Sequence, residues 1–365
     1  MKKLLIDVNS SVPYFVTGRV SGIGRTTIDL VNALAACGEL PFRVELFSQN
    51  MKGIGAKSFN VPFKKKHIYL PKRDVLDKMH LMDVVTRYDL LHIPHNFAYV
   101  AHPEKAIVTI HDAMFFSYPE KVFNTDFARK NYTEIAQQCK GIITCSEASK
   151  RDIVKYMNVP EDKVDVVYWG YNDELFKPRK HVKNDYCGDA PFFLCVSCNG
   201  ERKNTISVIR AYSEFFHKNV NHHLIVVWNS PSDDAVNVVA NNGLSENVHF
   251  VSGVTDEELA NLYSSATATF FPSLYEGFGL PILESMASGT PVVTCKNSSL
   301  EEVGGDAAIY VDPYDIKAMA EVMRNFDEKK FDLDDMKERV ISQANKFSWR
   351  KCAMQTIEIY KKYLL

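Results

Sequence analysis

The sequence predicts an α/β protein with two Rossmann-like, doubly wound domains that face each other across an interdomain cleft. Three observations lead to this fold class. Short apolar runs rich in β-branched residues alternate with helical patterns, which is typical of parallel strands joined by crossover helices. These runs lack polar alternation, as do strands that are buried on both faces. A length of 365 residues is typical of two domains rather than one.

The first half of the chain contains a series of predicted strands, with helices between several of them at Thr26–Ala36 and Phe127–Gln138. The strands are expected at Lys3–Val8, Phe42–Phe47, Leu90–Ile93, Ala106–Ile110, Ile142–Cys145 and Val164–Val167. The polar and charged stretch Pro178–Ala190 then interrupts the alternation, which is typical of a linker between domains. We therefore expect an N-terminal domain over residues 1–180.

After this stretch the alternation of strands and helices begins again, and we expect a C-terminal domain over residues 188–345. Its strands are expected at Phe192–Val196, Leu224–Val227, Val248–Val251, Thr267–Phe271, Pro291–Thr294 and Ala308–Val311. The amphipathic stretch Trp349–Tyr363 predicts a final helix. Because doubly wound sheets bind ligands outside the carboxyl ends of their strands, loops at the strand ends should line the cleft.

The composition argues against several classes of function. A net charge of −2 gives no field that attracts nucleic acid, so we expect no nucleic-acid partner. No run reaches the length of a membrane span, and the apolar start Met1–Asp7 is too short for a signal peptide. The eight cysteines are scattered, and the pair Cys195 and Cys198 lacks a second pair to complete a zinc site. We expect a cytoplasmic protein with reduced cysteines, no metal and no cofactor.

One local run of basic residues leaves two interpretations open. Lys64–His67, followed by Lys72 and Arg73, has the composition of a solvated loop. The same run is suited to contact an anionic acceptor or the inner face of a membrane.

The segment Phe271–Gly289 is the most informative part of the sequence. Gly277 and Gly279 permit the close approach of a ligand, and Pro281 suits the first position of a helix that Gly289 would terminate. A glycine-rich loop that leads into a helix attracts phosphate. The carboxylates of Glu276 and Glu284 bracket the loop and can accept hydrogen bonds from vicinal hydroxyl groups. A phosphate between hydroxyl-rich groups describes a nucleoside-diphosphate sugar, although Glu284 alone could be a surface acid near the helix start.

Three further groups follow predicted strands or precede a helix. Arg202 and Lys203 follow Phe192–Val196, where they either neutralise a diphosphate or belong to a solvated turn. The loop Gly22–Arg25 precedes a helix but lacks the third glycine of a dinucleotide fingerprint. His111 follows Ala106–Ile110 and is either a ligand of a sugar hydroxyl or a structural histidine.

Together these residues resemble the family 4 glycosyltransferases, a large retaining group with the GT-B fold. The segment from Glu276 to Glu284 is similar to the family's E-x7-E motif, and Arg202–Asn204, Ile110–Asp112 and Gly22–Arg25 occur in the matching order. The Gly-Ile-Gly-Arg form of the last element resembles the mannosyltransferases of O-antigen and capsule synthesis.

The resemblance implies a role for each of these positions. Arg202 and Lys203 would hold the donor diphosphate, and Glu284 would bind the ribose hydroxyls. Glu276 would hold the donor hexose and the distal phosphate, together with the backbone amides of Phe278, Gly279 and Leu280. His111 would contact the sugar near its C6 hydroxyl.

The remaining implied roles concern the edges of the site. Gly24 would approach the phosphate or the acceptor, and the backbone around Val254 would contact the base. The helix Trp349–Tyr363 would cross back to the N-terminal domain. Trp169 departs from the family pattern, and the segment Met51–Asp74 matches no pattern that identifies an acceptor.

The function implied is a retaining, metal-independent transfer of a hexose, with mannose from GDP-mannose as the preferred donor. The acceptor would be a glycan or a polyprenyl-linked glycan of surface polysaccharide synthesis, used in the cytoplasm with peripheral contact to the inner membrane face. A UDP- or dTDP-sugar donor is the first alternative. A GT-B UDP-N-acetylhexosamine epimerase is the second, and a non-catalytic partner that binds nucleotide sugars is a third.

Overall fold

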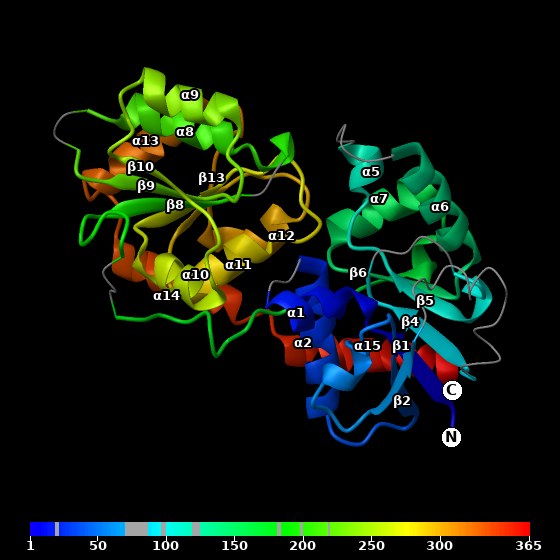
Figure 1. Ribbon diagram of the computed structural model, residues 1–365. Coiled ribbons are helices and arrows are strands. Elements are labelled where there is room, and N and C mark those ends of the chain that lie inside the picture. The colour runs from blue at the N-terminus through cyan, green and yellow to red at the C-terminus, as the bar shows by residue number, and fades with distance from the viewer. Residues whose placement is uncertain are drawn as a thin grey trace. The chain divides into compact units, whose positions relative to one another are not determined.

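The computed structural model describes residues 1–18, 22–69, 87–95, 100–118, 125–180, 184–197, 200–217 and 220–365. The chain divides into two compact units (Figure 1). Unit 1 comprises Met1–Gly170 and Ser348–Leu365, and unit 2 comprises Tyr171–Phe347. Each unit is a parallel sheet between helices, which confirms the predicted fold class of two doubly wound domains.

Unit 1 contains a seven-stranded parallel sheet in the order β3-β2-β1-β4-β5-β6-β7. Its strands are β1 Lys3–Asp7, β2 Arg43–Gln49, β3 Lys64–Ile68, β4 Leu90–Ile93, β5 Ala106–Thr109, β6 Gly141–Thr144 and β7 Val164–Val166. Its helices are α1 Val12–Thr17, α2 Gly22–Ala36, α5 Met114–Ser117, α6 Thr125–Gln138, α7 Glu147–Met157 and α15 Trp349–Leu364. The strand order reverses between β1 and β4, so the carboxyl ends of these two strands flank the switch point.

The last helix of the chain, α15, completes unit 1 by packing on α2 (Figure 1). The Tyr360 hydroxyl of α15 is hydrogen-bonded to Nδ1 of His92 in β4, at 2.7 Å. Tyr360 is fully buried, and its ring meets Phe42 edge to face with the centroids 5.9 Å apart. A segment distant in sequence therefore forms part of the core of the first sheet.

Unit 2 contains a six-stranded parallel sheet in the order β10-β9-β8-β11-β12-β13. Its strands are β8 Phe192–Val196, β9 His223–Val227, β10 Val248–Val251, β11 Ala268–Phe271, β12 Val292–Thr294 and β13 Ile309–Tyr310. Its helices are α8 Thr205–Phe215, α9 Asp233–Asn241, α10 Asp256–Ser265, α11 Leu280–Ala287, α12 Leu300–Gly304, α13 Ile316–Asp327 and α14 Leu333–Ala344. Helices α8, α9 and α13 cover one face, and α10, α11 and α14 cover the other (Figure 1). The switch point lies between β8 and β11.

The interpretation of the basic run as a solvated loop is wrong for Lys64–His67. These residues belong to β3, the edge strand of unit 1, and Lys64 lies opposite Glu45 of β2. Lysines on an edge strand are compatible with pairing on one side, and they discourage another chain from adding to the open side. The remaining basic residues of this run, Lys72 and Arg73, lie outside the described residues.

The division between the units lies between Gly170 and Tyr171, earlier than the predicted end of the first domain at residue 180. The described parts of the stretch predicted to be a linker belong to unit 2. There the guanidinium of Arg179 pairs with Glu257 and donates to Asn261 Oδ1 at 2.9 Å, both on α10. The Arg179 side chain therefore binds α10, whereas Lys180, Asp185 and Asp189 of the same stretch are exposed, as their polar composition indicated.

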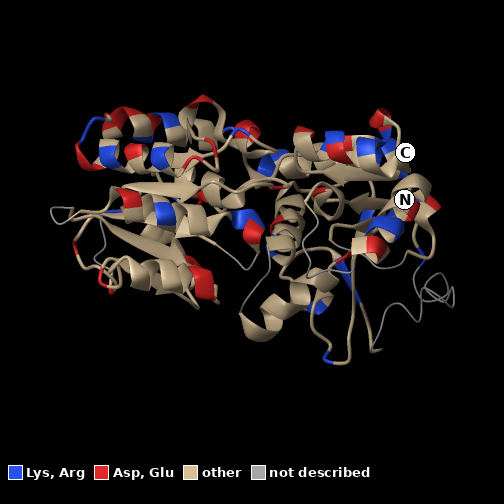
Figure 2. Cartoon of the chain, turned by 90° about the horizontal axis from the view of Figure 1, so that it is seen from above, with Lys and Arg blue, Asp and Glu red and all other residues tan. Residues whose placement is uncertain are grey.

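Charged residues are mixed in sign over the outer helices of both units (Figure 2). Among the described residues, no helix has both the length and the apolar character that a membrane crossing requires. Seven described cysteines are free thiols, and Cys198 lies outside the described residues. Within the same ranges, no cluster of three or more His, Cys, Asp or Glu side chains is arranged to hold a metal.

Candidate functional site

The predicted donor residues of unit 2 gather at the carboxyl ends of β8 and β11, the two strands at its switch point. A short 3-10 helix, Glu201–Lys203, lies between β8 and α8 and carries both predicted cations. The loop 272–279 connects β11 to α11 and carries Glu276. The topology therefore brings together two segments that are far apart in sequence, at the place where doubly wound sheets bind ligands.

The carboxylate of Glu276 is the centre of this cluster. Its Oε1 atom lies 2.8 Å from Nη1 of Arg202 and 2.8 Å from Nζ of Lys203. The same oxygen accepts a hydrogen bond of 2.6 Å from the Ser273 hydroxyl. Two cations and one anion leave one net positive charge at a site where the Glu276 residue is only 9% exposed. A buried site with excess positive charge is suited to bind a phosphate group.

The ionisation state of Glu276 follows from its neighbours. Burial opposes ionisation, but the Lys203 ammonium and the Arg202 guanidinium outweigh it, so the pKa of the Glu276 carboxyl is lowered. Glu276 is therefore a carboxylate at neutral pH. An ionised carboxylate has lone pairs to accept hydrogen bonds from sugar hydroxyls in addition to those it accepts here.

Both cations are held by further contacts, so they are positioned before a ligand binds. Nη1 of Arg202 donates to the Tyr275 carbonyl at 2.6 Å, and the Arg202 carbonyl accepts from the backbone N–H of Leu274 at 2.8 Å. Nζ of Lys203 lies 4.6 Å from the centroid of the Phe271 ring, a cation–π contact. These contacts fix the 3-10 helix to the loop that carries Glu276.

The next residue, Asn204, explains how the chain turns from this 3-10 helix into α8. It adopts a left-handed backbone conformation with φ of 54°, which asparagine tolerates better than most residues. Its Nδ2 atom donates to the carbonyls of Pro272 at 3.2 Å and Pro313 at 2.7 Å. The Asn204 side chain thus joins the turn after β8 to the end of β11.

The loop that precedes α11 has the shape that its glycines predicted. Gly279 is the N-cap with φ of 110°, and a Cβ there would lie 3.0 Å from Cδ2 of Leu300. Gly289 follows the helix with φ of 82°. Pro281 occupies the second rather than the first helical position, because α11 begins at Leu280. The first amides of a helix lack intrahelical acceptors, so this end of α11 offers donors to an anion.

Two serines that sequence reasoning missed are hydrogen-bonded to the backbone of loop 272–279. The Ser298 hydroxyl accepts from the backbone N–H of Glu276 at 3.0 Å. The Ser299 hydroxyl lies 2.9 Å from the Glu276 carbonyl oxygen and 2.7 Å from that of Phe278. Neither serine belongs to the E-x7-E pattern, because both follow β12 and reach the loop only through the fold. Ser273 lies three residues before Glu276, inside the informative segment Phe271–Gly289, and could have been found.

The structure excludes the interpretation of Glu284 as a surface acid. Glu284 lies beyond the first turn of α11, and it is 6% exposed. A carboxylate at this depth is not a solvated surface group. Val254 lies half-buried in the loop between β10 and α10, after the carboxyl end of β10.

The other two predicted site residues, Gly24 and His111, lie in unit 1. Gly24 is buried inside the first turns of α2, because this helix begins at Gly22 and not after the glycine loop as expected. His111 follows β5 and is 7% exposed. Its ring meets Trp169 edge to face, with the ring centroids 5.1 Å apart. The predicted residues thus form two groups, one in each unit.

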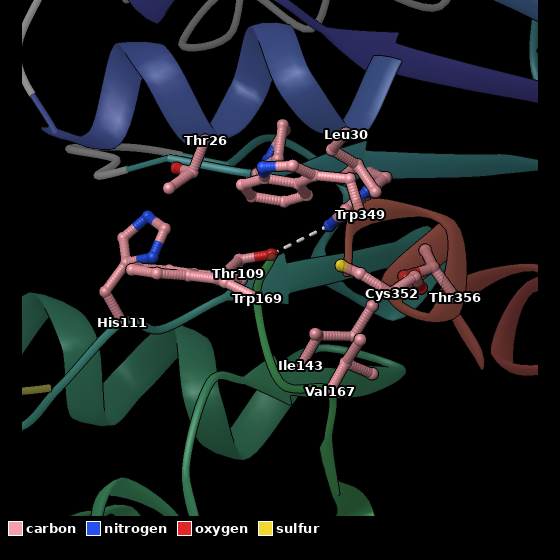
Figure 3. Close-up of a pocket in the computed structure, with 12 residues that line it drawn as sticks. Thr26, Leu30, Thr109, His111, Ile143, Val167, Trp169, Trp349, Cys352 and Thr356 are labelled. Carbon is pink, nitrogen blue, oxygen red and sulfur yellow. Dashed lines mark hydrogen bonds between the residues drawn. The ribbon is translucent and has the colours of Figure 1, made fainter. Parts of the chain in front are cut away.

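Two histidines near this second group, His92 and His111, are neutral. Both line a small cavity of unit 1 between α2, the start of α15 and the carboxyl ends of β4 to β7 (Figure 3). Burial lowers the pKa of His111 to about 3, helped by His95 and opposed by the nearby Pro94 carbonyl. Burial likewise lowers the pKa of His92 to about 3, helped by His95 and His111. At neutral pH these rings therefore act as hydrogen-bonding groups without charge.

Comparison with protein families covers most of the chain in two parts. Residues 20–175 match the family described as "Glycosyltransferase Family 4". Residues 176–347 match the family described as "Glycosyl transferases group 1". The boundary between the two matches lies close to the division between the two units.

Two curated relatives are mannosyltransferases by name. The chain is 27% identical to O-antigen chain mannosyltransferase B from Escherichia coli, over 94% of this chain and 96% of that protein. It is 31% identical to O-antigen chain mannosyltransferase RfbU from Salmonella typhimurium, over 64% of this chain and 67% of that protein.

Solved structures agree in fold at lower sequence identity. Sucrose-phosphate synthase from Thermosynechococcus elongatus superimposes with a TM-score of 0.74 at 19% identity, over 99% of both chains. HepE from Anabaena, in complex with UDP and glucose, superimposes with a TM-score of 0.73 at 17% identity, over 99% of this chain and 100% of HepE. At these identities the comparison establishes the two-domain architecture alone.

Proposed function

Since this chain belongs to the family 4 glycosyltransferases, we propose that it transfers mannose from GDP-mannose to a glycan or polyprenyl-linked glycan. The reaction belongs to surface polysaccharide synthesis and takes place in the cytoplasm, with a lipid-linked acceptor presented at the inner membrane face. The names of the two O-antigen mannosyltransferases support mannose as the sugar. The observation that carries the proposal is the buried Glu276 carboxylate held between Arg202 and Lys203 beside the start of α11.

The proposed reaction uses these charges to stabilise the leaving group. When the bond between the sugar and the β-phosphate breaks, negative charge accumulates on the departing diphosphate. Arg202, Lys203 and the first amides of α11 are positioned before the reaction and stabilise that charge. Their fixed positions avoid the cost of reorienting donors in the transition state.

The two glutamates bind hydroxyl groups in this proposal and do not attack the sugar. Glu276 accepts hydrogen bonds from the hexose, and Glu284 accepts them from the ribose. Oε1 of Glu276 is already engaged by two cations and a serine, which lowers its nucleophilicity. We therefore propose that the acceptor hydroxyl attacks from the face that the diphosphate leaves, with retention of configuration. The cations replace a metal ion in neutralising the diphosphate.

A second donor class is favoured by one specific observation. The HepE structures that share this fold contain UDP or UDP-glucose. A uridine nucleotide would use the same cations and the same helix start, because both donors carry a diphosphate. The base and the sugar distinguish the two donors, and these contact residues outside the Glu276 cluster.

The test is a thermal-shift panel of GDP-, UDP- and dTDP-sugars, followed by a transfer assay with a lipid-extracted acceptor. A ligand at about 100 times its Kd stabilises the protein by about 2.7 kcal/mol, which a panel of this kind detects. We expect GDP-mannose to give the largest shift and a glycoside product with the anomeric configuration retained in excess chelator. Stabilisation by UDP-sugars alone would support the second donor class. Epimerised sugar without a glycoside would exclude a transferase.

A further inference from the structure

The loop that follows β12 contains a strained residue close to the charged cluster of unit 2. Among the described residues, four that are not glycine have a left-handed backbone: Asn158, Asn204, Ser298 and Lys329. Asparagine tolerates this conformation better than most residues, and Lys329 is exposed just after the end of α13. Ser298 is half-buried and has φ of 45°, so its conformation requires an explanation from its surroundings.

Ser298 is the middle one of three consecutive residues whose side chains bind loop 272–279. Nδ2 of Asn297 donates to two backbone carbonyls of this loop, at 3.0 and 3.1 Å. The Ser298 hydroxyl accepts from the backbone N–H of Glu276 at 3.0 Å. The Ser299 hydroxyl donates to the carbonyl of the same glutamate at 2.9 Å. Strand β12 lies next to β11, so these residues reach the loop from the neighbouring strand.

The left-handed backbone explains how three side chains in a row can reach one loop. In an extended segment, successive side chains point to opposite sides, so a straight continuation of β12 could not supply all three. The turn at Ser298 removes this alternation. Asn297 and Ser299 are both anchored to the loop and hold the turn from either side. Strain of this kind persists only where the surrounding contacts impose it.

Glu276 is the residue that these contacts fix. Its N–H donates to Ser298 and its carbonyl accepts from Ser299, so its backbone is held at both of its polar groups. Its carboxylate, on a residue that is 9% exposed, contacts Arg202 and Lys203. If the Ser298 hydroxyl were absent, the Glu276 N–H would lose its acceptor, and the loop would have to shift or admit water.

We propose that Ser298 is a positioning residue of the transferase, whose strained backbone lowers stability while its hydroxyl holds Glu276 in place beside the two cations. Glycine adopts a left-handed conformation without the steric cost of a Cβ, so a residue selected only for stability at this position would be glycine. The inference rests on the proposed function, in which the Glu276 cluster binds the donor. All of the contacts that carry it lie within unit 2.

The test separates the hydroxyl from the backbone strain with two substitutions. Ser298→Ala removes the hydroxyl and keeps the strain, because alanine also has a Cβ. Ser298→Gly removes the hydroxyl and relieves the strain. We expect kcat/KM for the sugar nucleotide that wild type uses to fall about fivefold in both variants, the effect of one hydrogen bond.

Stability should distinguish the same two variants. In urea, Ser298→Gly should unfold near the wild-type midpoint, because the lost hydrogen bond and the relieved strain offset each other. Ser298→Ala should unfold at a clearly lower urea concentration, because it loses the hydrogen bond and keeps the strain. Hydrogen exchange of the peptide that covers loop 272–279 should be faster than wild type in both variants.

Lys329→Gly is the matched control, since it relieves a left-handed backbone with φ of 56° outside the site. Lys329 follows the end of α13, a position at which glycine is common. This variant should unfold at a higher urea concentration than wild type. Its kcat/KM and the exchange of the loop 272–279 peptide should equal those of wild type.

The inference is wrong if activity follows stability, with kcat/KM lost in Ser298→Ala and retained in Ser298→Gly, because that pattern indicates a purely structural serine. It is also wrong if both variants keep wild-type rates, or if the loop peptide exchanges no faster in either of them. If wild-type enzyme transfers no sugar from any nucleotide, the proposed function fails by itself. The exchange of the loop peptide then still decides whether Ser298 fixes Glu276.

Discussion

The site of unit 2 is charged and the cavity of unit 1 is lined by neutral side chains, although both lie at the carboxyl ends of parallel strands. In unit 2, two cations and a carboxylate meet at the switch point between β8 and β11. In unit 1, the neutral rings of His92 and His111 line a cavity at the carboxyl ends of β4 to β7. The buried pair of Asp7 and His95, with Oδ1 and Nε2 3.0 Å apart, lies at the switch point between β1 and β4. The same topology therefore supports either a charged or a neutral site, and the residues after each strand decide which.

The two sites compensate for the burial of ionisable groups in different ways. A buried charge requires a partner, and Glu276 has Arg202 and Lys203 within 2.8 Å. A buried histidine without such a partner loses its proton, as the lowered pKa values of His92 and His111 indicate. The first arrangement can bind a diphosphate, and the second can bind uncharged hydroxyl groups.

The largest effect on activity should come from removing Lys203, one of the two cations of the charged site. We expect Lys203→Ala to lose at least tenfold in kcat/KM, which is equivalent to about 1.4 kcal/mol. The loss should reach about a thousandfold if Lys203 acts mainly in the transition state. Lys330→Ala, at an exposed lysine that pairs with Glu328, is the control and should retain full activity. Steady-state kinetics with both variants measure the difference. Wild-type rates in Lys203→Ala would remove this lysine from the mechanism.

A steric change near the neutral cavity should lower the stability of unit 1. A Cβ on Gly170 would lie 2.1 Å from the backbone nitrogen of Trp349, at the start of α15. We expect Gly170→Ala to lower the free energy of unfolding by about 3 kcal/mol, because backbone atoms must move.

Gly22→Ala is the matched control for this substitution, since a Cβ on Gly22 meets nothing within 4 Å. Urea denaturation of the two variants gives the comparison. If both variants unfold at the same urea concentration, Gly170 does not fix the position of α15.

A decrease in pH should destabilise the neutral cavity and leave the charged site unaffected. His92 has a pKa near 3 in the folded protein and near 6.5 when unfolded, so its contribution is fully present above pH 6.5 and is lost as pH falls toward 3. Between pH 6.5 and 5 this loss is about 2 kcal/mol for a histidine that stays neutral when folded. His95 and His111, which face His92, add to the repulsion on protonation.

Glu276 has a lowered pKa, so its contribution is present above the ordinary value near 4.5 and survives this range. The protection against hydrogen exchange of peptides that cover β4 and β5, corrected for the slower intrinsic exchange at low pH, should therefore fall at pH 5, and it should fall less in the His92→Gln variant. Unit 2 also has three histidines of lowered pKa, His222, His223 and His249. They lie near the amino ends of β9 and β10, whereas loop 272–279 follows the carboxyl end of β11. An equal fall in protection of the peptide that covers loop 272–279 would contradict the distinction between the two sites.

The smallest effect should come from the support of the charged loop. Ser299→Ala removes a buried hydroxyl that lies beside the carbonyls of Glu276 and Phe278, at a cost of about 1 kcal/mol. We expect a KM for the donor that is about fivefold higher, with little change in kcat. Ser288→Ala is the control, because among the described residues the buried hydroxyl of Ser288, the C-cap of α11, donates only to the Glu284 carbonyl. A KM that rises equally in both variants would indicate a general loss of stability.

Much of the fold could be predicted because buried parallel strands leave a strong pattern in the sequence. The apolar runs at 90–93, 192–196 and 248–251 coincide with β4, β8 and β10 at both ends. Strand β3 was missed because its lysines lie on an edge, where one open side tolerates charge and hides the apolar signal. The assigned roles of the site residues in binding and transfer stay predictions until ligands are tested.

By itself the sequence determined which residue types follow which strands, because the chemistry of Glu276, Arg202 and Lys203 is local to each segment. Only the tertiary structure decided that these side chains meet on one carboxylate oxygen, since residues 202 and 276 become neighbours through the order of β8 and β11. It also decided that Glu284 is buried and that Trp349, near the end of the chain, lies beside His111. Burial and neighbourhood are set by packing between distant segments, and packing is what a linear pattern does not contain.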